Sequence, residues 1–386
     1  MERGLYESDH EEFRGLARNF VAREVAGHVD EWDAQHSIDS SVWRAAGDQG
    51  LLGIAVPEEF GGAGIADYRY RCVIVEELAR VQAGSLAAGF SVQDDIVIPY
   101  ILSLGTPEQK RRWLPDLVSG VKRGSIGMTE PGAGSDLRGI RTNAVKTDGG
   151  WILNGAKTFI TSGITSDIIV TATKTDSVDA AGSHAFSLVV VESGMNGFDR
   201  GRKLAKLGLH GQDTAELFFH DVFIPDANVL GDIGGGLIEL MKHLPLERLS
   251  IAVQAIASAA AVFEATLAYT NEREAFGKPI ADFQNTRFEL AEMSTEIDVT
   301  RAYLDKAVLA YNDGQLSAVE AAKAKWWATD MQGRVIDRCL QLFGGYGYMM
   351  EYPVARAYQD ARVQRIFGGT NEIMKELIGR DLVGRR

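Results

Sequence analysis

The sequence is poor in the residues that build covalent and metal-based frameworks. It contains only two cysteines, Cys72 and Cys339, which stand far apart, so neither a disulfide framework nor a thiolate metal site is expected. The seven histidines never fall at the HExxH spacing or beside a CxxC pair, and we predict no protein-ligated metal. This cysteine usage fits a reducing compartment.

Positive charge and targeting signals are also scarce. Lysine and arginine total 40 against 53 aspartates and glutamates, and the net charge of −13 disfavours nucleic acid and anionic lipid as partners. Residues 1–13 lack the pattern of a signal or transit peptide, and no transmembrane segment is predicted. We therefore expect a cytoplasmic protein of bacterial type, or a mitochondrial matrix protein only if the chain is a processed form.

The composition is that of a globular protein, and its pattern changes twice along the chain. With 386 residues, of which 45% are hydrophobic and 24% charged, two or three domains are expected. Residues 1–122 and 237–386 are helical in pattern, whereas residues 123–236 carry short β-type runs with tight turns. We predict an α+β, mostly α fold whose middle domain is a small antiparallel barrel or sandwich.

The β-type runs and the last helical region allow more detailed predictions. Asp148-Gly149-Gly150 and Asn154-Gly155 are typical turn sequences between strands. In the last region, apolar residues recur at steps of three and four, which predicts one buried face of a long helix. That face consists of Leu249, Val253, Ile256, Ala260, Phe263 and Leu267.

Three glycine-rich segments could present backbone N–H groups to a ligand. They are MTEPGAGSD at 128–136, FGGYGY at 343–348 and FGGTN at 367–371, whereas glycine-rich 231–236 is favoured as a hinge over a phosphate loop. The first is not a Rossmann fingerprint, because Leu137 stands where the third glycine would fall. Each could be a structural turn, with Thr370 or Asn371 as a helix N-cap. Three together favour a large phosphorylated cofactor.

Several motifs in one order carry a family resemblance. They are GLLGIAVPEEFGGAG at 50–64, MTEPGAGSD at 128–136, WILNGAKTFITSG at 151–163, DTAELFF at 213–219, REAFGKPIADFQ at 273–284, LFGGYGY at 342–348 and IFGGTNEI at 366–373. Over nearly the whole chain they resemble an acyl-CoA dehydrogenase, most closely the long-chain branch. The resemblance implies an N-terminal helical domain, a middle antiparallel β-barrel domain, a C-terminal four-helix bundle, FAD, an acyl-CoA substrate and a homotetramer built as a dimer of dimers.

The resemblance also implies where FAD contacts the chain. The loop from Ile126 to Ser135 would hold the flavin ring edge and pyrophosphate, and residues 159–161 would line the other face. Many members carry Trp where this chain has Phe159, so the stacking contact is smaller here. The implied contacts are Ile126, Met128, Thr129, Ser135, Phe159, Ile160, Thr161, Thr370 and Glu372 from one chain, with Arg273, Phe276, Gln284, Gln341, Gly344 and Gly345 from a neighbouring subunit.

The chain departs from the commonest family pattern at the catalytic base. Many members carry a glutamate before the Gly-Thr of the third glycine-rich segment, but this chain has Gly368 there. The long-chain and isovaleryl branches instead place the base early in the long C-terminal helix, in a Glu-Arg-Leu context that Glu247 matches. A glutamate beside an arginine is usually a solvated pair, and only the vacancy at 368 reverses that interpretation. The implied catalytic residues are Glu247 and Gly368, and the implied substrate contacts are Ser135, Arg248, Phe367, Gly368 and Gly369.

A length argument independent of the family supports a site shared between subunits. If residues 247–273 form one helix, Glu247 and Arg273 lie roughly 39 Å apart and cannot easily serve the same end of one flavin. The alternative for Arg273 is a solvated helix end.

The predicted reaction is the FAD-dependent α,β-dehydrogenation of a fatty acyl-CoA to the trans-2-enoyl-CoA. Glu247 would take the α-proton, the β-hydrogen would leave as hydride to flavin N5, and electrons would pass to an electron-transfer flavoprotein. The N–H of Gly368 would donate to the thioester oxygen. Arg248 would contact the substrate side of the pocket or orient Glu247, and the alternative for Arg248 is a purely structural salt bridge. The alternatives are an acyl-CoA oxidase or desaturase of specialised metabolism on the same fold, and a non-catalytic acyl-CoA-binding paralogue. Acyl chain length is left open.

Overall fold

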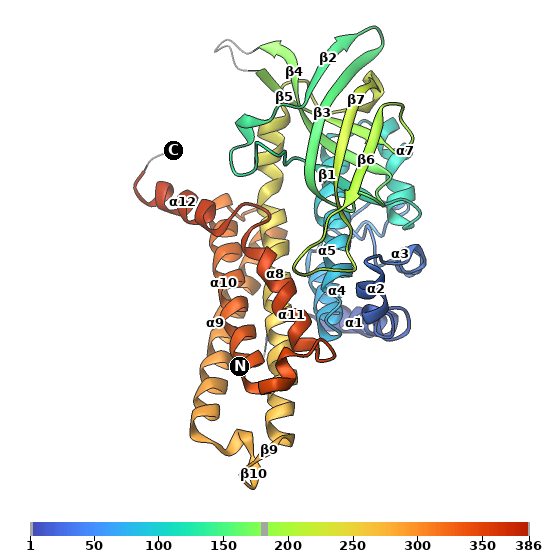
Figure 1. Cartoon of the computed structure of the whole chain (residues 1–386). Helices are drawn as coiled ribbons and strands as arrows, with labels where there is room; N and C mark the ends of the chain where they lie inside the picture. Colours follow the sequence, from blue (N-terminus) through green and yellow to red (C-terminus); the bar gives the residue numbers. More distant parts are fainter. Residues whose placement is uncertain (1–2, 179–183, 385–386) are drawn as a thin grey trace.

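The computed structural model describes residues 3–178 and 184–384, which form three regions in chain order. The first region is helical and precedes a sheet, which is followed by a second helical region (Figure 1). The mostly α, α+β fold class is therefore confirmed, while the borders after residues 122 and 236 remain predictions. The helices of the first region are α1 (Ser8–Phe20), α2 (Val29–Gln35), α3 (Ser40–Asp48), α4 (Arg69–Arg80), α5 (Gly84–Ser91), α6 (Ile98–Leu104) and α7 (Pro107–Val118).

Eight strands form the middle sheet, in the order β6-β7-β3-β2-β4-β5-β8, with β1 paired to β4. Most pairs are antiparallel, as predicted, but β1 and β2 each pair with β4 in parallel. Among the described residues, this hydrogen-bonded path has two ends and records no closing pair between β6 and β8. The strands are β1 (Gly124–Gly127), β2 (Asn143–Thr147), β3 (Gly150–Thr161), β4 (Ile168–Val178), β5 (His184–Glu192), β6 (Phe198–Lys203), β7 (Thr214–Pro225) and β8 (Val229–Leu230).

One of the two predicted turns is wrong. Asp148-Gly149 does join β2 to β3, and Gly149 has a φ of +70°. Asn154-Gly155 instead lies inside β3, where the register with β7 shifts as in a β-bulge. Gly155 has a φ of +147°, and a Cβ on it would lie 2.5 Å from the Thr142 hydroxyl oxygen. Glycine is therefore required here by close packing rather than by chain reversal.

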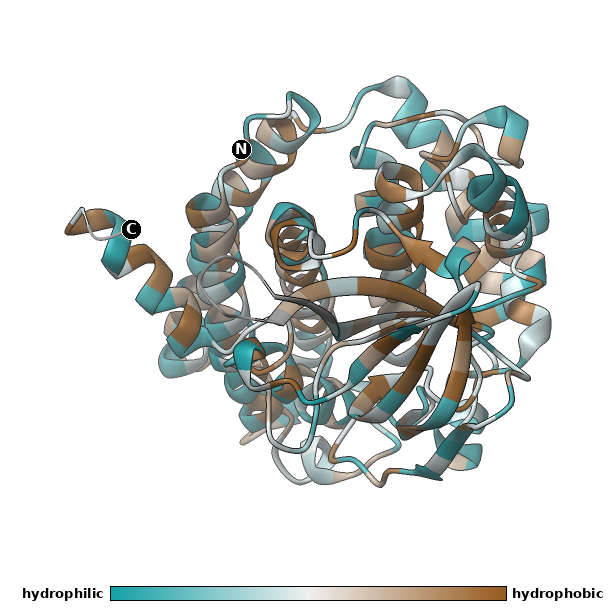
Figure 2. Ribbon diagram, turned by 90° about the horizontal axis from the view of Figure 1, so that it is seen from above, coloured by the Kyte–Doolittle hydropathy of each residue, from teal (hydrophilic) through white to brown (hydrophobic). Residues whose placement is uncertain are grey.

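Strands β4 and β5 are buried on both faces. Ile169 and Val189 pack with residues of the other strands, whereas Ile168 and Val190 pack against side chains of α6 and α7. This burial explains their almost continuous apolar sequences. On other strands, hydrophobic and hydrophilic residues alternate, as Figure 2 shows from above.

The second helical region is built on one very long helix, α8. It runs from the sheet to the opposite end of the molecule (Figure 1). It is long and apolar enough to cross a membrane, but 61% of its most apolar window is buried inside the protein, as in the core helix of a globular domain. The remaining elements are β9 (Glu274–Ala275), β10 (Lys278–Pro279), α9 (Gln284–Asn312), α10 (Ala318–Phe343), α11 (Pro353–Ala361) and α12 (Asn371–Leu382), after α8 (Gly236–Glu272).

The predicted apolar face of α8 is largely confirmed. Leu249, Val253, Ile256 and Ala260 are buried in a core shared with α4, α9 and α10. Leu267 is 41% exposed, so the buried face ends before the helix does.

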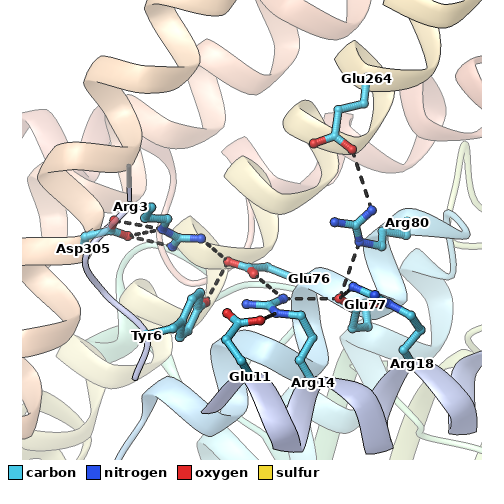
Figure 3. Close-up of polar contacts among 10 residues, drawn as sticks. All are labelled: Arg3, Tyr6, Glu11, Arg14, Arg18, Glu76, Glu77, Arg80, Glu264 and Asp305. Carbon is cyan, nitrogen blue, oxygen red and sulfur yellow. Dashed lines mark hydrogen bonds and ion pairs between the residues drawn. The ribbon is translucent and has the colours of Figure 1, made fainter. Parts of the chain in front are cut away.

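A network of charged groups attaches the N-terminal residues to the helices (Figure 3). Arg3 donates to Glu76 of α4 and to Asp305 of α9, each at 2.6 Å. Arg14 of α1 also donates to Glu76, and Arg14 and Arg18 contact the buried carboxylate of Glu77. Because these carboxylates are largely buried, several cations and Tyr6 are needed to compensate them.

Candidate active site

Glu247 lies on α8 and is almost fully buried, with 5% of its surface exposed. The hydroxyl of Tyr100, on α6, donates a hydrogen bond to its Oε1 at 3.1 Å. Burial raises the pKa of Glu247 to about 7, although the Tyr100 hydrogen bond and the charge of Arg248 oppose the shift. A carboxyl group in this state can accept a proton near neutral pH.

Arg248 connects α8 to the third glycine-rich segment. Its guanidinium is buried, which lowers its pKa, and the neighbouring Glu247 partly offsets that effect. Its Nε faces the carbonyl oxygen of Gly368 at 3.5 Å. The structure therefore places Arg248, and with it the adjacent Glu247, beside Gly368, which is 120 residues away in the sequence.

Gly368 and Gly369 adopt backbone conformations that favour glycine, with φ values of +64° and +91°. A Cβ on Gly368 would lie 2.3 Å from the Cδ1 atom of Ile251 on α8. The position where many family members carry the base therefore has no room for a side chain here unless Ile251 moves. Phe367, the preceding residue, is half-buried.

Lys325 is a residue at this site that the sequence patterns missed. It lies on α10, is fully buried, and donates from Nζ to the carbonyl oxygen of Gly369 at 2.8 Å and to Asn371 Oδ1 at 2.9 Å. Burial and the nearby charge of Arg248 lower its pKa to about 7. The sequence signal that could have identified Lys325 is its position on an apolar helix face, between Ala321 and Ala328, both of which are buried.

The two held carbonyls orient the N–H groups of the same loop. In a trans peptide the C=O and the following N–H point in opposite directions. Because Arg248 and Lys325 lie on the side of the Gly368 and Gly369 carbonyls, the N–H groups of Gly369 and Thr370 point away from α8 and α10. Across residues 3–178 and 184–384, no acceptor is recorded for the N–H groups of residues 368–370. Such a loop before a helix N-terminus suits an anionic or polar ligand.

Thr370 and Glu372 lie at the start of α12. The side chain of Thr370 accepts a hydrogen bond from the N–H of Ile373, so Thr370 is the N-cap, one of the two predicted candidates. Glu372 is exposed in the first turn.

A buried ion pair fixes the position of the first glycine-rich segment. Lys157 Nζ lies 2.8 Å from Glu130 Oε1 and also donates to the carbonyl oxygen of Met128 at 3.1 Å. Burial lowers the pKa of Lys157 to about 8, against the opposing effect of Glu130. Glu130 accepts two further bonds, from the N–H groups of residues 141 and 142. The loop is thus fixed through its backbone, with Ser135 exposed.

Residues 158–161 lie beside that loop. The N–H of Thr158 donates to the carbonyl oxygen of Thr129 at 2.9 Å, which joins the two predicted flavin-contacting segments. Phe159 has a φ of +58° and is 68% exposed, whereas Ile160 is buried. The left-handed backbone conformation of Phe159 is unfavourable for a residue with a side chain. The exposure of its apolar ring is unfavourable as well, and a ligand that covered the ring would remove this second cost. Ile126 is half-buried in β1.

The other predicted FAD contacts lie at the far end of α8. An open cleft of about 470 Å³ is lined by Arg273, Gly344 and Gly345, together with Tyr269, Phe343 and Tyr346. The Arg273 guanidinium lies 5.6 Å from the centre of the Tyr346 ring. Phe276, Gln284 and Gln341 are exposed, and Phe276 is 97% exposed.

The two groups of predicted residues are far apart in one chain. Glu247 and Arg273 are joined by a continuous helix, so they are separated by roughly 39 Å. A single chain therefore does not bring all the predicted cofactor contacts together.

The comparison with known proteins gives the family. The chain matches the N-terminal domain of acyl-CoA dehydrogenases over residues 7–121, the middle domain over residues 125–222 and the C-terminal domain over residues 234–383. The chain belongs to the acyl-CoA dehydrogenase family. It is therefore an FAD-dependent enzyme that dehydrogenates acyl-CoA.

Individual relatives agree along nearly the whole chain. The mitochondrial long-chain specific acyl-CoA dehydrogenase of Sus scrofa is 46% identical over 381 residues, covering 99% of this chain and 88% of the relative. The mitochondrial isovaleryl-CoA dehydrogenase of Solanum tuberosum is 36% identical over 380 residues, covering 98% and 91%. A crystal structure of acyl-CoA dehydrogenase from Geobacillus kaustophilus superposes with a TM-score of 0.95 at 46% identity, covering 99% of this chain and 100% of that one. The family predicted from the motifs is confirmed.

Proposed function

We propose that this acyl-CoA dehydrogenase converts a fatty acyl-CoA to the trans-2-enoyl-CoA with Glu247 as the base that takes the α-proton. The observation that carries the proposal is the state of Glu247, a buried carboxyl with a hydrogen-bonded Oε1 and a pKa raised to about 7. A base is most effective when its pKa lies near the working pH. The positive φ of Gly368 and the close approach of Ile251 Cδ1 disfavour a side chain at that position, which supports the same assignment.

The residues of the chain fit FAD. The exposed ring of Phe159, next to the hydrogen bond between Thr158 N–H and the carbonyl oxygen of Thr129, offers a face for the isoalloxazine. Ile126, Met128, Ser135 and Thr161 would contact the same cofactor, whereas the side chain of Ile160 is buried, so Ile160 would contact it only through its backbone. The N-terminus of α12, with Thr370 and Glu372, would close the site. When bound, FAD accepts the β-hydrogen of the substrate as hydride.

The substrate thioester would lie against the loop of residues 367–370. The N–H of Gly368 would donate to the thioester oxygen and stabilise the developing negative charge. Arg248 holds the carbonyl of Gly368 and keeps this loop against α8. Phe367 and Gly369 would wall the acyl group, and Ser135 would contact the CoA side.

A second copy of the chain would complete the cofactor site. Arg273, Phe276, Gln284, Gln341, Gly344 and Gly345 would contact the adenosine end of a neighbour's FAD. Arg273 follows the end of α8 that lies far from Glu247, and it lines one cleft with Gly344 and Gly345. A homotetramer, an electron-transfer flavoprotein as electron acceptor and a bacterial-type cytoplasmic location complete the proposal.

The test is an anaerobic visible spectrum with a panel of acyl-CoA thioesters from short branched to long straight chains. The wild-type flavin band should bleach, and Glu247→Gln should keep FAD and bind acyl-CoA but slow the bleaching by about 10²–10⁴-fold. Glu264→Gln, which changes an exposed glutamate of the same helix, is the matched control. Retained bleaching in Glu247→Gln would place the base elsewhere, and rapid reoxidation of the reduced enzyme in air would contradict the proposed acceptor.

A further inference from the structure

Tyr100 is a fully buried residue of α6 that contacts the proposed base from another part of the chain. Its hydroxyl donates to Glu247 Oε1 at 3.1 Å, across 147 residues of sequence. The α6 helix directly follows a π-helical segment at Val92–Val97. Such segments change the direction in which the following side chains point, and they are frequent at functional sites.

The ring of Tyr100 is fixed by a second residue of α8. His243 stacks on it with ring centroids 4.1 Å apart and an interplanar angle of 20°. His243 and Glu247 are four residues apart and therefore lie on the same face of α8. One face of the helix thus holds Tyr100 at two points, by stacking on its ring and by accepting its hydroxyl hydrogen.

His243 is itself fixed by its two ring nitrogens. Nδ1 lies 2.9 Å from the carbonyl oxygen of Glu239, and Nε2 lies 2.8 Å from the hydroxyl of Ser103 on α6. The stack therefore has little freedom to rotate, and neither has the Tyr100 hydroxyl. A hydrogen bond with both partners fixed has already lost its conformational entropy before substrate binds.

The charged and titratable groups around this pair are few. Glu247 faces Arg248 on its own helix and Tyr100 on α6, and the charge of Arg248 acts in turn on Lys325 of α10. Tyr100 additionally faces Glu239 and the ring of His243. Burial and the charge of Glu247 raise the pKa of Tyr100, so its hydroxyl keeps its proton and acts as the donor.

We propose that Tyr100 is a positioning residue for the reaction, which fixes Oε1 of Glu247 and leaves Oε2 to take the substrate proton. The proposal rests on the proposed function, in which Glu247 is the base. In this proposal Tyr100 acts on the reaction through Glu247. By donating to the carboxylate, its hydroxyl favours the ionised form of Glu247 and opposes the effect of burial.

The test compares Tyr100→Phe with the wild type by the rate of anaerobic flavin reduction between pH 5 and 9, at saturating levels of the acyl-CoA that reduces the wild type fastest. At the acidic end of the pH–rate profile (its acidic limb) the rate falls because Glu247 becomes protonated. Since a hydrogen bond to a charged group is strong, its loss should move this acidic limb about one to two pH units upward. We expect a rate about tenfold lower at pH 7 that returns to within about threefold of the wild type at pH 9. A uniform loss at all pH values with an unmoved limb would overturn the proposal.

Two control variants separate this effect from general damage. Tyr311→Phe changes a half-buried tyrosine for whose hydroxyl no hydrogen bond is recorded in the described part of the chain, and it should leave the profile unchanged. His243→Phe keeps an aromatic stack but replaces the imidazole that faces Tyr100. If His243→Phe moved the limb as far as Tyr100→Phe does, the limb would report on His243 and the proposal would be wrong.

A substituted tyrosine that keeps the ring and its hydroxyl gives a prediction of opposite sign. Site-specific 3,5-difluorotyrosine at position 100 keeps the hydroxyl and makes it a stronger donor, so the acidic limb should move downward. A limb that stays in place or moves upward would contradict the proposal.

The protonation of Glu247 can also be followed directly, in a measurement that needs neither turnover nor flavin. The protonated carboxyl stretch of Glu247, identified in the infrared spectrum of the apoprotein as the band that Glu247→Gln removes, should titrate at higher pH in Tyr100→Phe. If Glu247→Gln abolishes flavin reduction but this band titrates identically in Tyr100→Phe and wild type, only the role of Tyr100 fails. If Glu247→Gln retains reduction, the proposed base fails whatever Tyr100 does.

Discussion

The ammonium group of the fully buried Lys325 donates a hydrogen bond to the carbonyl oxygen of the half-buried Gly369 at 2.8 Å. No carboxylate forms an ion pair with Lys325 among the described residues. The lysine instead bonds to neutral oxygen atoms of the loop that would hold the thioester. It therefore fixes the loop at the cost of a buried cationic group.

Replacing Lys325 should alter both turnover and the pH dependence of stability. The folded pKa of about 7 lies below the usual 10.5, so between these values the unfolded chain binds more protons and stability rises with pH. Lys325→Met removes this group, so the free energy of unfolding of wild type relative to the variant should increase between pH 7 and 10. Chemical unfolding at several pH values measures it. A difference in unfolding free energy that stays constant with pH would contradict a buried charge at Lys325. Lys323→Met, on the same helix, is the control.

Glu247→Gln should stabilise the protein at alkaline pH. A shift in pKa from 4.5 to about 7 means that the folded state binds more protons than the unfolded state between these values, and stability falls as pH rises through them. The shift corresponds to about 3 kcal/mol above pH 7, which the variant avoids. The apoproteins of variant and wild type should therefore differ in unfolding free energy at pH 8 and converge at pH 4.5. A variant less stable than wild type at pH 8 would show that Glu247 is not destabilised by burial.

The sequence could predict those parts of the fold that depend on local patterns. The steps of three and four at Leu249, Val253 and Ile256 placed one face of α8 in the core, and Thr370 capped α12 as its residue type suggests. Asn154-Gly155 was wrongly predicted to be a turn, because the need for glycine came from close contact with Thr142, which directly precedes β2. The parallel pairing of β1 and β2 with β4 likewise depends on residues far apart in the chain, which no local pattern records.

The candidate site was predictable only where a motif carried it. Glu247 and Gly368 followed from the family pattern, and the structure places them around Arg248. Tyr100 and Lys325 were not found, because a single tyrosine or lysine on a helix is indistinguishable in sequence from a core or solvated residue. Their contacts with Glu247 and Gly369 join α6 to α8 and α10 to the loop before α12, and only tertiary packing shows them.

The buried pair of Lys157 and Glu130 should matter for flavin affinity. Lys157→Met leaves the Glu130 carboxylate with only its two backbone donors and releases the carbonyl of Met128. Removing one partner of a buried pair costs about 3–5 kcal/mol. We expect a loss of unfolding free energy near the lower end of this range. FAD should also bind more weakly, which is measured by flavin release on dilution.

The matched control for this pair is Lys122→Met. Lys122 forms an ion pair with Asp116 at 2.8 Å, but both side chains are more than one-third exposed. Its loss should change stability by less than about 1 kcal/mol and leave FAD binding intact. Equal losses in the two variants would mean that the buried pair does not hold the flavin loop.

Gly368→Ala should be costly because of both space and backbone conformation. The new Cβ would lie 2.3 Å from Ile251 Cδ1, and the φ of +64° disfavours any residue with a side chain. We expect at least a tenfold loss in the rate of flavin reduction, measured by stopped flow. Ile251→Val removes the clashing atom, so the double variant should recover part of the loss. No recovery would assign the whole effect to backbone strain.

Arg3 should anchor the N-terminal segment in a pH-dependent way (Figure 3). Although burial opposes it, Arg3 and Arg14 hold the pKa of Glu76 below its usual 4.5, so the stabilisation is present above that pH and is lost as the carboxyl protonates in acid. Arg3→Met leaves Glu76 with Arg14 and Tyr6, and we expect a loss of about 1–2 kcal/mol at pH 7. Hydrogen exchange should then be faster in residues 8–20, while Arg111→Met, which breaks an exposed pair, should leave it unchanged. The wild type should approach the variant in stability below pH 4, and a difference that persisted there would mean that Arg3 does not act through the carboxylate of Glu76 alone but also through Asp305 or by packing.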